Sequence, residues 1–359
     1  MRKYVTLGDV CKKGSSNIAQ KDIENINGTY AIYGASGYIK DVNFYHQDKP
    51  YIAVVKDGAG IGRTMLLPEK TSVIGTLQYL IPNDSVSVKY LYYAITYMNL
   101  SKYFTGATIP HIYFKDYQKE LLPLPPMEKQ QEIAETLEKV DTMIELCNTI
   151  MEKMDVLVKS RFVEMFGDPT DNPMGWDKFP LGKRCNIITG NTPPRANAEN
   201  YGTFIEWIKS DNINTPDTYL TVAEEYLSEK GFEKCRYVEA GSVLMTCIAG
   251  SIGCIGNVAV ADRRVAFNQQ INAIVPVNDE TLYVFWLMQL SKPYIQSTIN
   301  MALKGILSKG QLSVLEFPFP PMLEQTDFAA FVQEIDKSKL VCSHMVLYIE
   351  ILLRKERIL

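Results

Sequence analysis

The sequence predicts an α+β protein in which two similar mixed α/β globular domains are joined by two long helices. Three observations carry this prediction. A proline-rich motif occurs twice, and its copies at Pro125 and Pro320 lie 195 positions apart. A long heptad pattern of apolar residues follows each copy. A glycine-containing turn also recurs, at 58–63 and 249–254, each time after an apolar run. This internal repetition predicts two equivalent halves.

The repeat also sets the predicted domain boundaries. A chain of 359 residues suits two domains of ordinary size with connecting elements. A hydrophobic content of 46% with 22% charged residues is typical of a globular protein with substantial cores. We expect globular domains at 1–126 and 167–321, a first long helix at 127–166 and a second at 322–359.

The segment 127–166 has the pattern of one continuous helix. Pro125 and Pro126 stand just before its start, where missing N–H donors cost least, and Gly167 follows its end. Its apolar residues recur in steps of three and four, which is the spacing of a coiled-coil seam. The predicted seam contains Ile133, Leu137, Val140, Ile144, Met151, Met154 and Val158.

The second helix has the same spacing. Its predicted seam contains Phe331, Ile335, Met345, Ile349 and Leu352, with Ser338 as a polar interruption. Two heptad helices of similar length suit one another as coiled-coil partners. The pattern permits either orientation, and antiparallel pairing would relate the two halves by a pseudo-two-fold axis. Two unrelated core helices are the alternative.

The distribution of charge says more than the net charge of −4. Residues 1–126 carry 14 Lys and Arg against 10 Asp and Glu, whereas residues 127–170 carry 5 against 10. The first long helix is therefore not expected to lie along DNA. The first globular part is mildly basic. The second is near neutral, which permits a local basic face without demonstrating one.

The expected location is the cytoplasm. Seven cysteines, an odd number with no C-x-x-C pair, fit a reducing compartment better than a disulfide framework. No apolar run is long enough for a transmembrane helix, and the N-terminus has no signal-peptide core. We interpret the cysteines as small buried apolar residues, and expect neither a metal site nor a membrane partner.

No motif for catalysis is found. Residues 58–62 fit a phosphate-binding glycine loop imperfectly, because no helical run follows and no Walker lysine–serine pair occurs. A tight turn between two strands is the preferred interpretation. The segment from Asn191 to Arg195 is close to the Asn-Pro-Pro-Tyr motif of amino-methyltransferases, but a threonine intervenes and the aromatic residue is missing. The chain is therefore predicted not to be an enzyme.

Both globular parts contain loops rich in amides, hydroxyls, aromatics and single basic residues, which suit contacts to base edges and phosphate oxygens. In the first half the candidate DNA-binding residues are Tyr33, Ser36, Lys56, Arg63, Thr108 and His111. In the second half they are Asn191, Thr192, Arg195, Lys209, Asn212, Asn268, Gln269, Lys304 and Lys309. A solvated loop without function is the alternative for each loop taken singly.

Taken together, these features resemble one family. The duplicated proline motifs lead into long helices, and the first helix ends in the run 161–169, Arg-Phe-Val-Glu-Met-Phe-Gly-Asp-Pro. The second globular part opens with Trp176 and Leu181-Gly182, followed by the turn Thr189-Gly190-x-Thr192-Pro193. The whole chain resembles the DNA-specificity subunit of type I restriction–modification systems.

This resemblance implies a non-catalytic DNA-binding adaptor. Each globular part is then a target recognition domain that reads one half of a bipartite, asymmetric target in double-stranded DNA, and the two helices form an antiparallel coiled-coil spacer. Two methyltransferase subunits are implied as partners, with motor–nuclease restriction subunits joining them. S-adenosylmethionine, ATP and Mg are expected on those partners, and no cofactor on this chain. The alternative is a coiled-coil scaffold whose globular domains bind protein.

Overall fold

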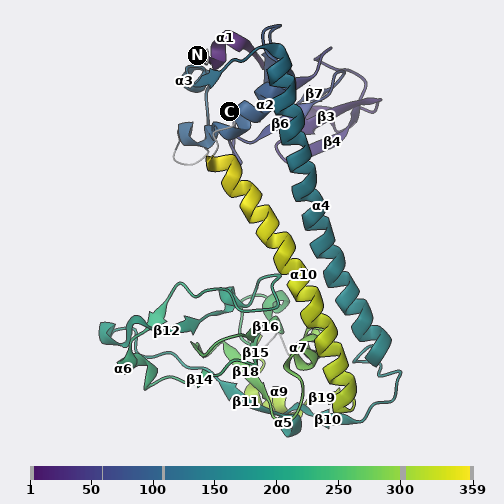
Figure 1. Cartoon of the computed structure of the whole chain (residues 1–359), viewed down its shortest axis with the longest axis vertical. Coiled ribbons are helices and arrows are strands. Elements are labelled where there is room, and N and C mark those ends of the chain that lie inside the picture. Colours follow the sequence, from purple (N-terminus) through teal and green to yellow (C-terminus); the bar gives the residue numbers. More distant parts are fainter. Residues whose placement is uncertain (1–3, 59, 107–109, 300–304, 356–359) are drawn as a thin grey trace. The chain divides into compact units, whose positions relative to one another are not determined.

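The computed structural model describes residues 4–58, 60–106, 110–299 and 305–355 (Figure 1). The chain forms two compact units. Unit 1 contains Met1–Cys147 with His344–Leu359, and unit 2 contains Asn148–Ser343. Each unit therefore contains one globular part together with a portion of both long helices, α4 (Met127–Phe166) and α10 (Met322–Lys355). The helix α4 has the range that its heptad pattern predicts.

A four-stranded antiparallel sheet is the centre of unit 1. Its strand order is β2 (Cys11–Ser15), β8 (Leu77–Pro82), β5 (Tyr51–Val55) and β6 (Thr64–Leu67). The strand β5 is buried throughout: Ile52 and Val54 face one core, and Tyr51, Ala53 and Val55 face another. The remaining elements are β1 (Tyr4–Thr6), α1 (Leu7–Val10), η1 (Gln20–Ile23), β3 (Tyr30–Gly34), β4 (Gly37–Val42), β7 (Ser72–Val73), α2 (Val88–Tyr97), η2 (Leu100–Tyr103), α3 (Phe114–Tyr117) and β9 (Leu121–Pro123).

Unit 2 repeats this topology. Its central sheet has the order β11 (Cys185–Thr189), β18 (Ile271–Pro276), β15 (Ser242–Thr246) and β16 (Val258–Ala261). In both units a second sheet contains a parallel pair, β3 with β7 and β12 (Tyr201–Ile208) with β17 (Val265–Phe267). The remaining elements are β10 (Lys178–Pro180), α5 (Leu181–Arg184), η3 (Ala198–Asn200), η4 (Ser210–Asn212), β13 (Tyr226–Leu227), α6 (Glu229–Phe232), β14 (Tyr237–Val238), η5 (Ile252–Cys254), α7 (Thr281–Leu290), α8 (Lys292–Ser297), α9 (Lys309–Val314) and β19 (Glu316–Pro318).

The glycine-containing segment 58–62 is a turn between two strands, as its sequence predicts. It joins the antiparallel strands β5 and β6. Gly58, Gly60 and Gly62 all have positive φ, a conformation that glycine adopts without steric cost. A Cβ on Gly62 would also lie 2.5 Å from the backbone nitrogen of Ser101. Close approach to η2 therefore adds a second reason for glycine at this position.

The duplicated proline motif has a structural role that begins with a glutamine. In unit 1 the buried Gln130 accepts a hydrogen bond at Oε1 from the backbone N–H of Ser87, which precedes α2, at 2.8 Å. Its Nε2 donates to the carbonyl of Pro125 at 2.9 Å. The hydroxyl of Tyr90 donates to the carbonyl of Pro123 at 2.7 Å. The motif thus fastens the start of α4 to the start of α2.

The copy in unit 2 repeats these contacts. Gln325 is buried, accepts from the backbone N–H of Glu280 at 3.0 Å and donates to the carbonyl of Pro320 at 2.9 Å. The hydroxyl of Tyr283 donates to the carbonyl of Pro318 at 2.7 Å. A buried amide satisfies backbone groups that would be costly to leave unpaired. This requirement explains why the motif is present in both halves.

The acceptor for the second N–H of this glutamine differs between the units. Gln130 donates to the backbone carbonyl of Ser85 at 3.1 Å, whereas Gln325 donates to the carboxylate of Asp279 at 2.9 Å. The Asp279 side chain is only 1% exposed and is paired with Arg184, at 3.0 Å from Nε to Oδ2 and 2.5 Å from Nη2 to Oδ1. Unit 2 therefore uses a buried ion pair where unit 1 uses a neutral peptide group.

Within unit 2 the two long helices run antiparallel. The rings of Phe162 on α4 and Phe328 on α10 have centroids 5.3 Å apart. Closer to the N-terminus of α4, Asp155 forms an ion pair with Lys339, which lies closer to the C-terminus of α10. Residue numbers decrease along α4 in the direction in which they increase along α10. The antiparallel pairing implied by the family resemblance is confirmed.

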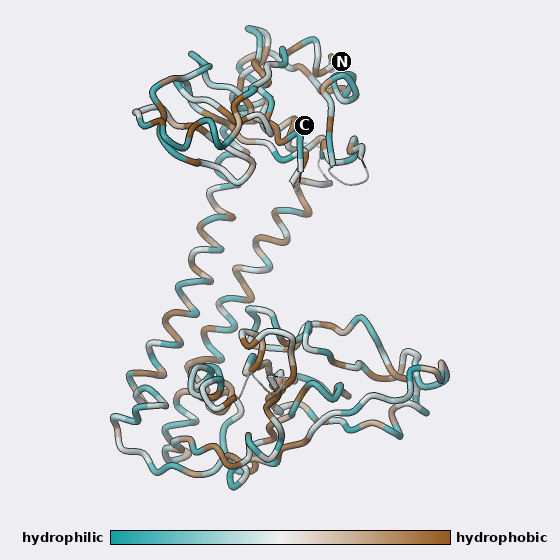
Figure 2. Tube along the Cα trace, turned by 180° about the vertical axis from the view of Figure 1, so that it is seen from behind, coloured by the Kyte–Doolittle hydropathy of each residue, from teal (hydrophilic) through white to brown (hydrophobic). Residues whose placement is uncertain are grey.

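The seam of α10 differs from its prediction. The predicted seam residues of α4 are all buried or half-buried, but Met345 on α10 is 43% exposed and its neighbour Val346 is half-buried instead. Lys339, not the exposed Ser338, is the half-buried polar residue among the seam positions. Apolar residues recur closely along both helices (Figure 2), and a period of 3.6 lets several registers fit such a pattern. Within the described residues, no helix has an apolar stretch that could cross a membrane.

Candidate nucleic-acid interface

Two predicted segments of unit 1 meet at Arg63. The exposed Ser36 lies in the two-residue turn between β3 and β4, and the half-buried Tyr33 lies near the end of β3. Arg63, at the end of the glycine turn, donates from Nη1 to the carbonyl of Ala35 at 3.2 Å. Tyr38 on the opposite strand is 59% exposed. An exposed guanidinium therefore stands beside an exposed aromatic hairpin, and both are available to a ligand.

Residues 110–113 contact the same turn. The backbone N–H of Ile112 donates to the carbonyl of Lys56 at 3.0 Å, and that of Gly58 donates to the carbonyl of Pro110 at 3.0 Å. The side chains of His111 and Asp57 add a contact of 2.5 Å between Nδ1 and Oδ1. The ammonium of Lys56 lies 3.5 Å from the Asp57 carboxylate. Thr108 lies outside the described residues.

Two neighbouring residues were missed by the sequence reasoning. Tyr113 is 49% exposed and stacks on His111, with ring centroids 6.0 Å apart. The Lys115 ammonium lies 5.4 Å from the centroid of the Tyr113 ring. A histidine, a tyrosine and a lysine at alternate positions around the buried Ile112 were the available signal. Such exposed aromatic and basic side chains suit stacking and phosphate contact.

Three predicted amides in unit 2 have structural partners. Asn191 accepts from the backbone N–H of Arg236 at 2.8 Å and donates to the carbonyl of Lys234 at 2.8 Å. The buried Asn212 accepts from the backbone N–H of Lys209 at 3.1 Å. Asn268, also buried, accepts from the backbone N–H of Gln270 at 3.0 Å. Their contacts hold loops in shape, and base contact by these residues remains a prediction.

Other contacts bring the predicted segments of unit 2 together. The hydroxyl of Thr192 bonds to the amide of the exposed Gln269. The ring nitrogen of Trp207, on β12, donates to the carbonyl of Asn191 at 3.4 Å. Lys309 is exposed at the first position of α9. Lys304 lies outside the described residues.

Two of the predicted cations of unit 2, Arg195 and Lys209, share one carboxylate. Arg195 lies 2.8 Å from Oε2 of Glu225, and Lys209 pairs with Oε1 of the same residue. The Lys209 ammonium, with the Arg195 guanidinium, holds the pKa of Glu225 below its usual value despite partial burial. The Arg195 guanidinium also lies 4.8 Å from the centroid of the Trp207 ring. The sequence offered no signal for Glu225, which lies 30 positions from Arg195.

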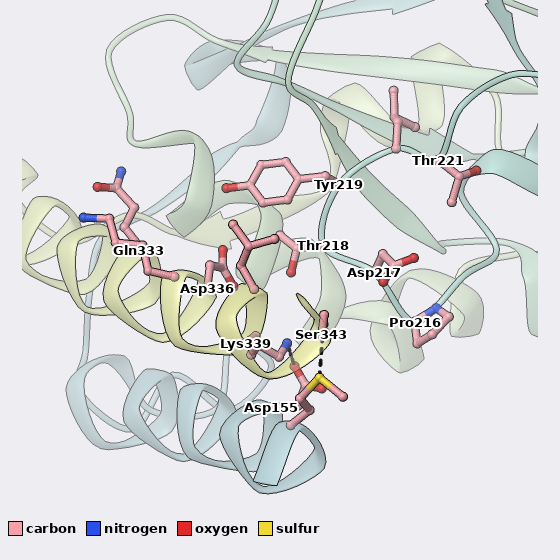
Figure 3. Close-up of a pocket in the computed structure, with 14 residues that line it drawn as sticks. Asp155, Pro216, Asp217, Thr218, Tyr219, Thr221, Gln333, Asp336, Lys339 and Ser343 are labelled. Atoms are coloured by element: carbon pink, nitrogen blue, oxygen red, sulfur yellow. Dashed lines mark hydrogen bonds and ion pairs between the residues drawn. The ribbon is translucent and has the colours of Figure 1, made fainter. Parts of the chain in front are cut away.

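A cavity of about 750 Å³ lies between the segment 216–221 and the two helices of unit 2 (Figure 3). Tyr219 extends over α10, near Asp336, while Lys339 is paired with Asp155 below it. Oδ2 of Asp336 is buried, and the hydroxyl of Tyr219 interacts with this carboxyl. Burial raises the pKa of this carboxyl, against opposing effects of Lys339 and Tyr219, which lower it.

No assembly of reactive groups accompanies these sites. The described ranges contain no group of three or more His, Cys, Asp or Glu side chains that could hold a metal ion. Burial raises the pKa of the Cys11, Cys185 and Cys247 thiols to about 12, so they stay protonated at neutral pH.

The chain is similar to known proteins along most of its length. A family model described as "Type I restriction modification DNA specificity domain" matches residues 2–155 and 173–342. The specificity subunit of the type I restriction enzyme HindI of Haemophilus influenzae is 31% identical over 140 residues, which are 38% of this chain and 28% of that protein. The MjaIX specificity subunit of Methanocaldococcus jannaschii is 30% identical over 170 residues, 46% of this chain and 38% of that protein.

These two matches span less than half the length of each curated relative. A solved structure covers more of the chain. The S subunit of a type I restriction–modification system from M. genitalium has a TM-score of 0.64 at 14% identity, over 98% of this chain and 94% of that one. At this identity the likeness shows a shared fold.

Proposed function

The chain belongs to the family of type I restriction–modification DNA specificity proteins, and from this membership we propose that it reads DNA for a type I restriction–modification complex. Each unit reads one half of a bipartite target. The two units share a topology but differ in the residues of their loops, so the two half-sites differ and the target is asymmetric. The long helices are the spacer between the two readers.

The observation that carries this proposal is the twofold convergence of candidate segments. In unit 1 the hairpin around Ser36, the turn that ends at Arg63 and residues 110–113 are joined by hydrogen bonds. In unit 2 the segments around Thr192, Lys209 and Gln269 are joined in a similar way. Polar and aromatic side chains gathered on several loops suit base and phosphate contact.

Members of this family are non-catalytic, and the catalytic activities lie in other subunits. We place the cofactors of the proposed complex, namely S-adenosylmethionine, ATP and Mg, on those partners. This chain would recognise the DNA sequence, and the partners would catalyse the reactions. The proposed partners are two methyltransferase subunits, joined by motor–nuclease subunits where the system also restricts.

The long helices offer a surface for these partners. They carry exposed apolar side chains outside the seam. In unit 2 these are Val156, Leu157, Val163, Leu323, Leu340 and Val341. In unit 1 they are Met143, Leu146, Met345, Leu347, Tyr348 and Ile351. We propose that the methyltransferase subunits cover these side chains, with basic groups meeting the acidic first helix.

The test is co-expression with a methyltransferase subunit encoded beside this chain, followed by mapping of methylated adenines across the genome. The proposal predicts a stable complex and a split motif with two defined half-sites and a fixed gap. A complex that methylates without any motif would contradict DNA reading by this chain. Absence of any complex would favour the coiled-coil scaffold instead.

A further inference from the structure

Glu225 lies between Arg195 and Lys209, two of the candidate phosphate-binding cations of unit 2. Its two carboxylate oxygens are engaged separately, one by Arg195 at 2.8 Å and the other by Lys209. The Glu225 side chain is 35% exposed, so water and ions reach it. A carboxylate and a DNA phosphate present similar oxygen pairs to a guanidinium. The same two cations therefore fit either partner, but not both at once.

The cations are held in place without Glu225. The Arg195 guanidinium lies 5.0 Å from the ring centroid of Tyr201 and 4.8 Å from that of Trp207. The Lys209 ammonium lies 5.6 Å from the Trp207 centroid. Trp207 is buried, and its backbone N–H donates to the carbonyl of Glu225 at 3.0 Å. Cation–π contacts with Trp207 thus position both cations, and the backbone hydrogen bond from Trp207 positions Glu225 beside them.

We propose that Glu225 is an internal substitute for a DNA phosphate, and that DNA must displace its carboxylate before Arg195 and Lys209 can bind the backbone. This inference rests on the proposed DNA-reading function and assigns a regulatory residue within it. Non-target DNA offers mainly phosphate contacts, so this competition keeps its binding weak. Target DNA adds base contacts that offset the displacement.

The competition has a measurable signature in salt. Each phosphate neutralised by a cation contributes about 0.9 to the slope of log K against log salt for duplex DNA. While Glu225 neutralises Arg195 and Lys209, these two residues contribute little to that slope. Replacing the carboxylate by an amide of the same shape removes the competing charge and leaves a hydrogen-bond acceptor in place.

The experiment compares the full-length chain with its Glu225→Gln variant, using fluorescence anisotropy of a labelled random-sequence duplex at several salt concentrations. We expect binding to tighten by about fivefold to tenfold near 0.1 M salt, and the slope to steepen by about 1 to 2. Glu199→Gln is the matched control, because Glu199 forms an exposed ion pair with Lys230 in the same unit. It removes the same charge and should change neither quantity.

A second variant tests whether the tighter DNA binding acts through Arg195 and Lys209. Adding Arg195→Gln and Lys209→Gln to Glu225→Gln should abolish the increase. An equal gain in the Glu199 variant would mean that general charge repulsion is responsible, and would overturn the assignment. Unchanged binding by a folded Glu225 variant, while the parent chain binds DNA, would also overturn it and leave the proposed function standing. No binding by either protein at the lowest salt would count against DNA reading itself.

Discussion

Unit 1 and unit 2 have the same strand order but place charge differently at equivalent positions. Behind the proline motif, unit 1 uses the carbonyl of Ser85 and unit 2 uses the carboxylate of Asp279, paired with Arg184. At the bridge between residues 57 and 111, unit 1 has the polar pair of His111 and Asp57. At the corresponding bridge, unit 2 has Ile248 with Ile306.

The shared fold depends on hydrogen-bond geometry at a few backbone groups. The side chains around these groups can be ionic, neutral or apolar. In both units a backbone N–H of the last loop donates to the residue after the central strand, from Ile112 to Lys56 at 3.0 Å and from Leu307 to Cys247 at 2.9 Å. Side chains at these places are free to diverge, and different surfaces then result from one scaffold.

The largest expected effect is on the stability of unit 2, when Arg184 is replaced by valine, the residue at the corresponding position of unit 1. Arg184 is the last residue of α5 as Val10 is the last residue of α1, and each precedes a buried cysteine. We expect Arg184→Val to lower the free energy of unfolding of unit 2 by about 3 kcal/mol, because the buried Asp279 carboxylate loses its counter-charge. All three tryptophans, at 176, 207 and 286, lie in unit 2, so tryptophan fluorescence during urea unfolding reports this unit alone.

Two further variants sharpen this test. Arg264→Val removes an arginine from an exposed pair with Glu239 in the same unit, and should leave the unfolding midpoint nearly unchanged. Adding Asp279→Asn to Arg184→Val should recover part of the loss, since the amide oxygen can still accept from Gln325. A loss no larger than that of the Arg264 variant would show that the buried pair contributes nothing to stability.

The next effect tests whether the glutamine has the same role in both units. We expect Gln325→Leu and Gln130→Leu each to lower the free energy of unfolding by about 2 kcal/mol, because each leaves a part-buried backbone N–H and a proline carbonyl unpaired. Circular dichroism should detect both losses. Only Gln325→Leu should shift the tryptophan transition, since Gln130 belongs to unit 1. A shift of the tryptophan unfolding transition in the Gln130→Leu variant would contradict independent unfolding of the two units.

A smaller effect is expected on DNA affinity through unit 1. Arg63→Gln keeps a donor for the carbonyl of Ala35 but removes the charge. Binding of a random-sequence duplex should weaken by about tenfold near 0.1 M salt, and the salt slope should fall by about 1. Lys49→Ala, at an exposed lysine outside the predicted segments, is the control. Equal losses in both variants would argue against a specific role for Arg63.

The sequence predicted the architecture because periodic and repeated signals report it directly. The heptads of α4 and the motif ending in Gln130 are contiguous along the chain, so their meaning survives without a structure. The seam of α10 was predicted less well, since Met345 and Val346 are both apolar and only packing distinguishes them.

The candidate interface was harder to predict. Buried amides such as Asn212 and exposed ones such as Gln269 look alike in sequence, although their surroundings differ. The pairing of Arg195 with Glu225 joins positions 30 apart and has no period to reveal it. Contacts of this kind depend on how strands are ordered in the sheet, which local pattern does not encode.

The smallest expected effect concerns the pH dependence of unit 2. Burial raises the pKa of Asp336 in the folded state above its unfolded value. The folded state therefore favours the proton, and this stabilisation, complete below the unfolded pKa, is lost as pH rises through the folded pKa. We expect Asp336→Asn to remove that loss. The Tm of this variant should exceed that of the parent chain by about 1–2 °C at pH 7. The difference is small because water partly screens the carboxyl.

The control is Asp327→Asn, since Asp327 is an exposed carboxylate on the same helix and in the same unit as Asp336. Thermal unfolding followed by tryptophan fluorescence at pH 4 to pH 8 should show the gap opening with rising pH for Asp336→Asn only. A gap that is constant across this range would mean that the amide improves packing or hydrogen bonding, and that the buried charge is not the cause. A gap that closes with rising pH would reverse the sign and place a stabilising partner on the ionised carboxylate.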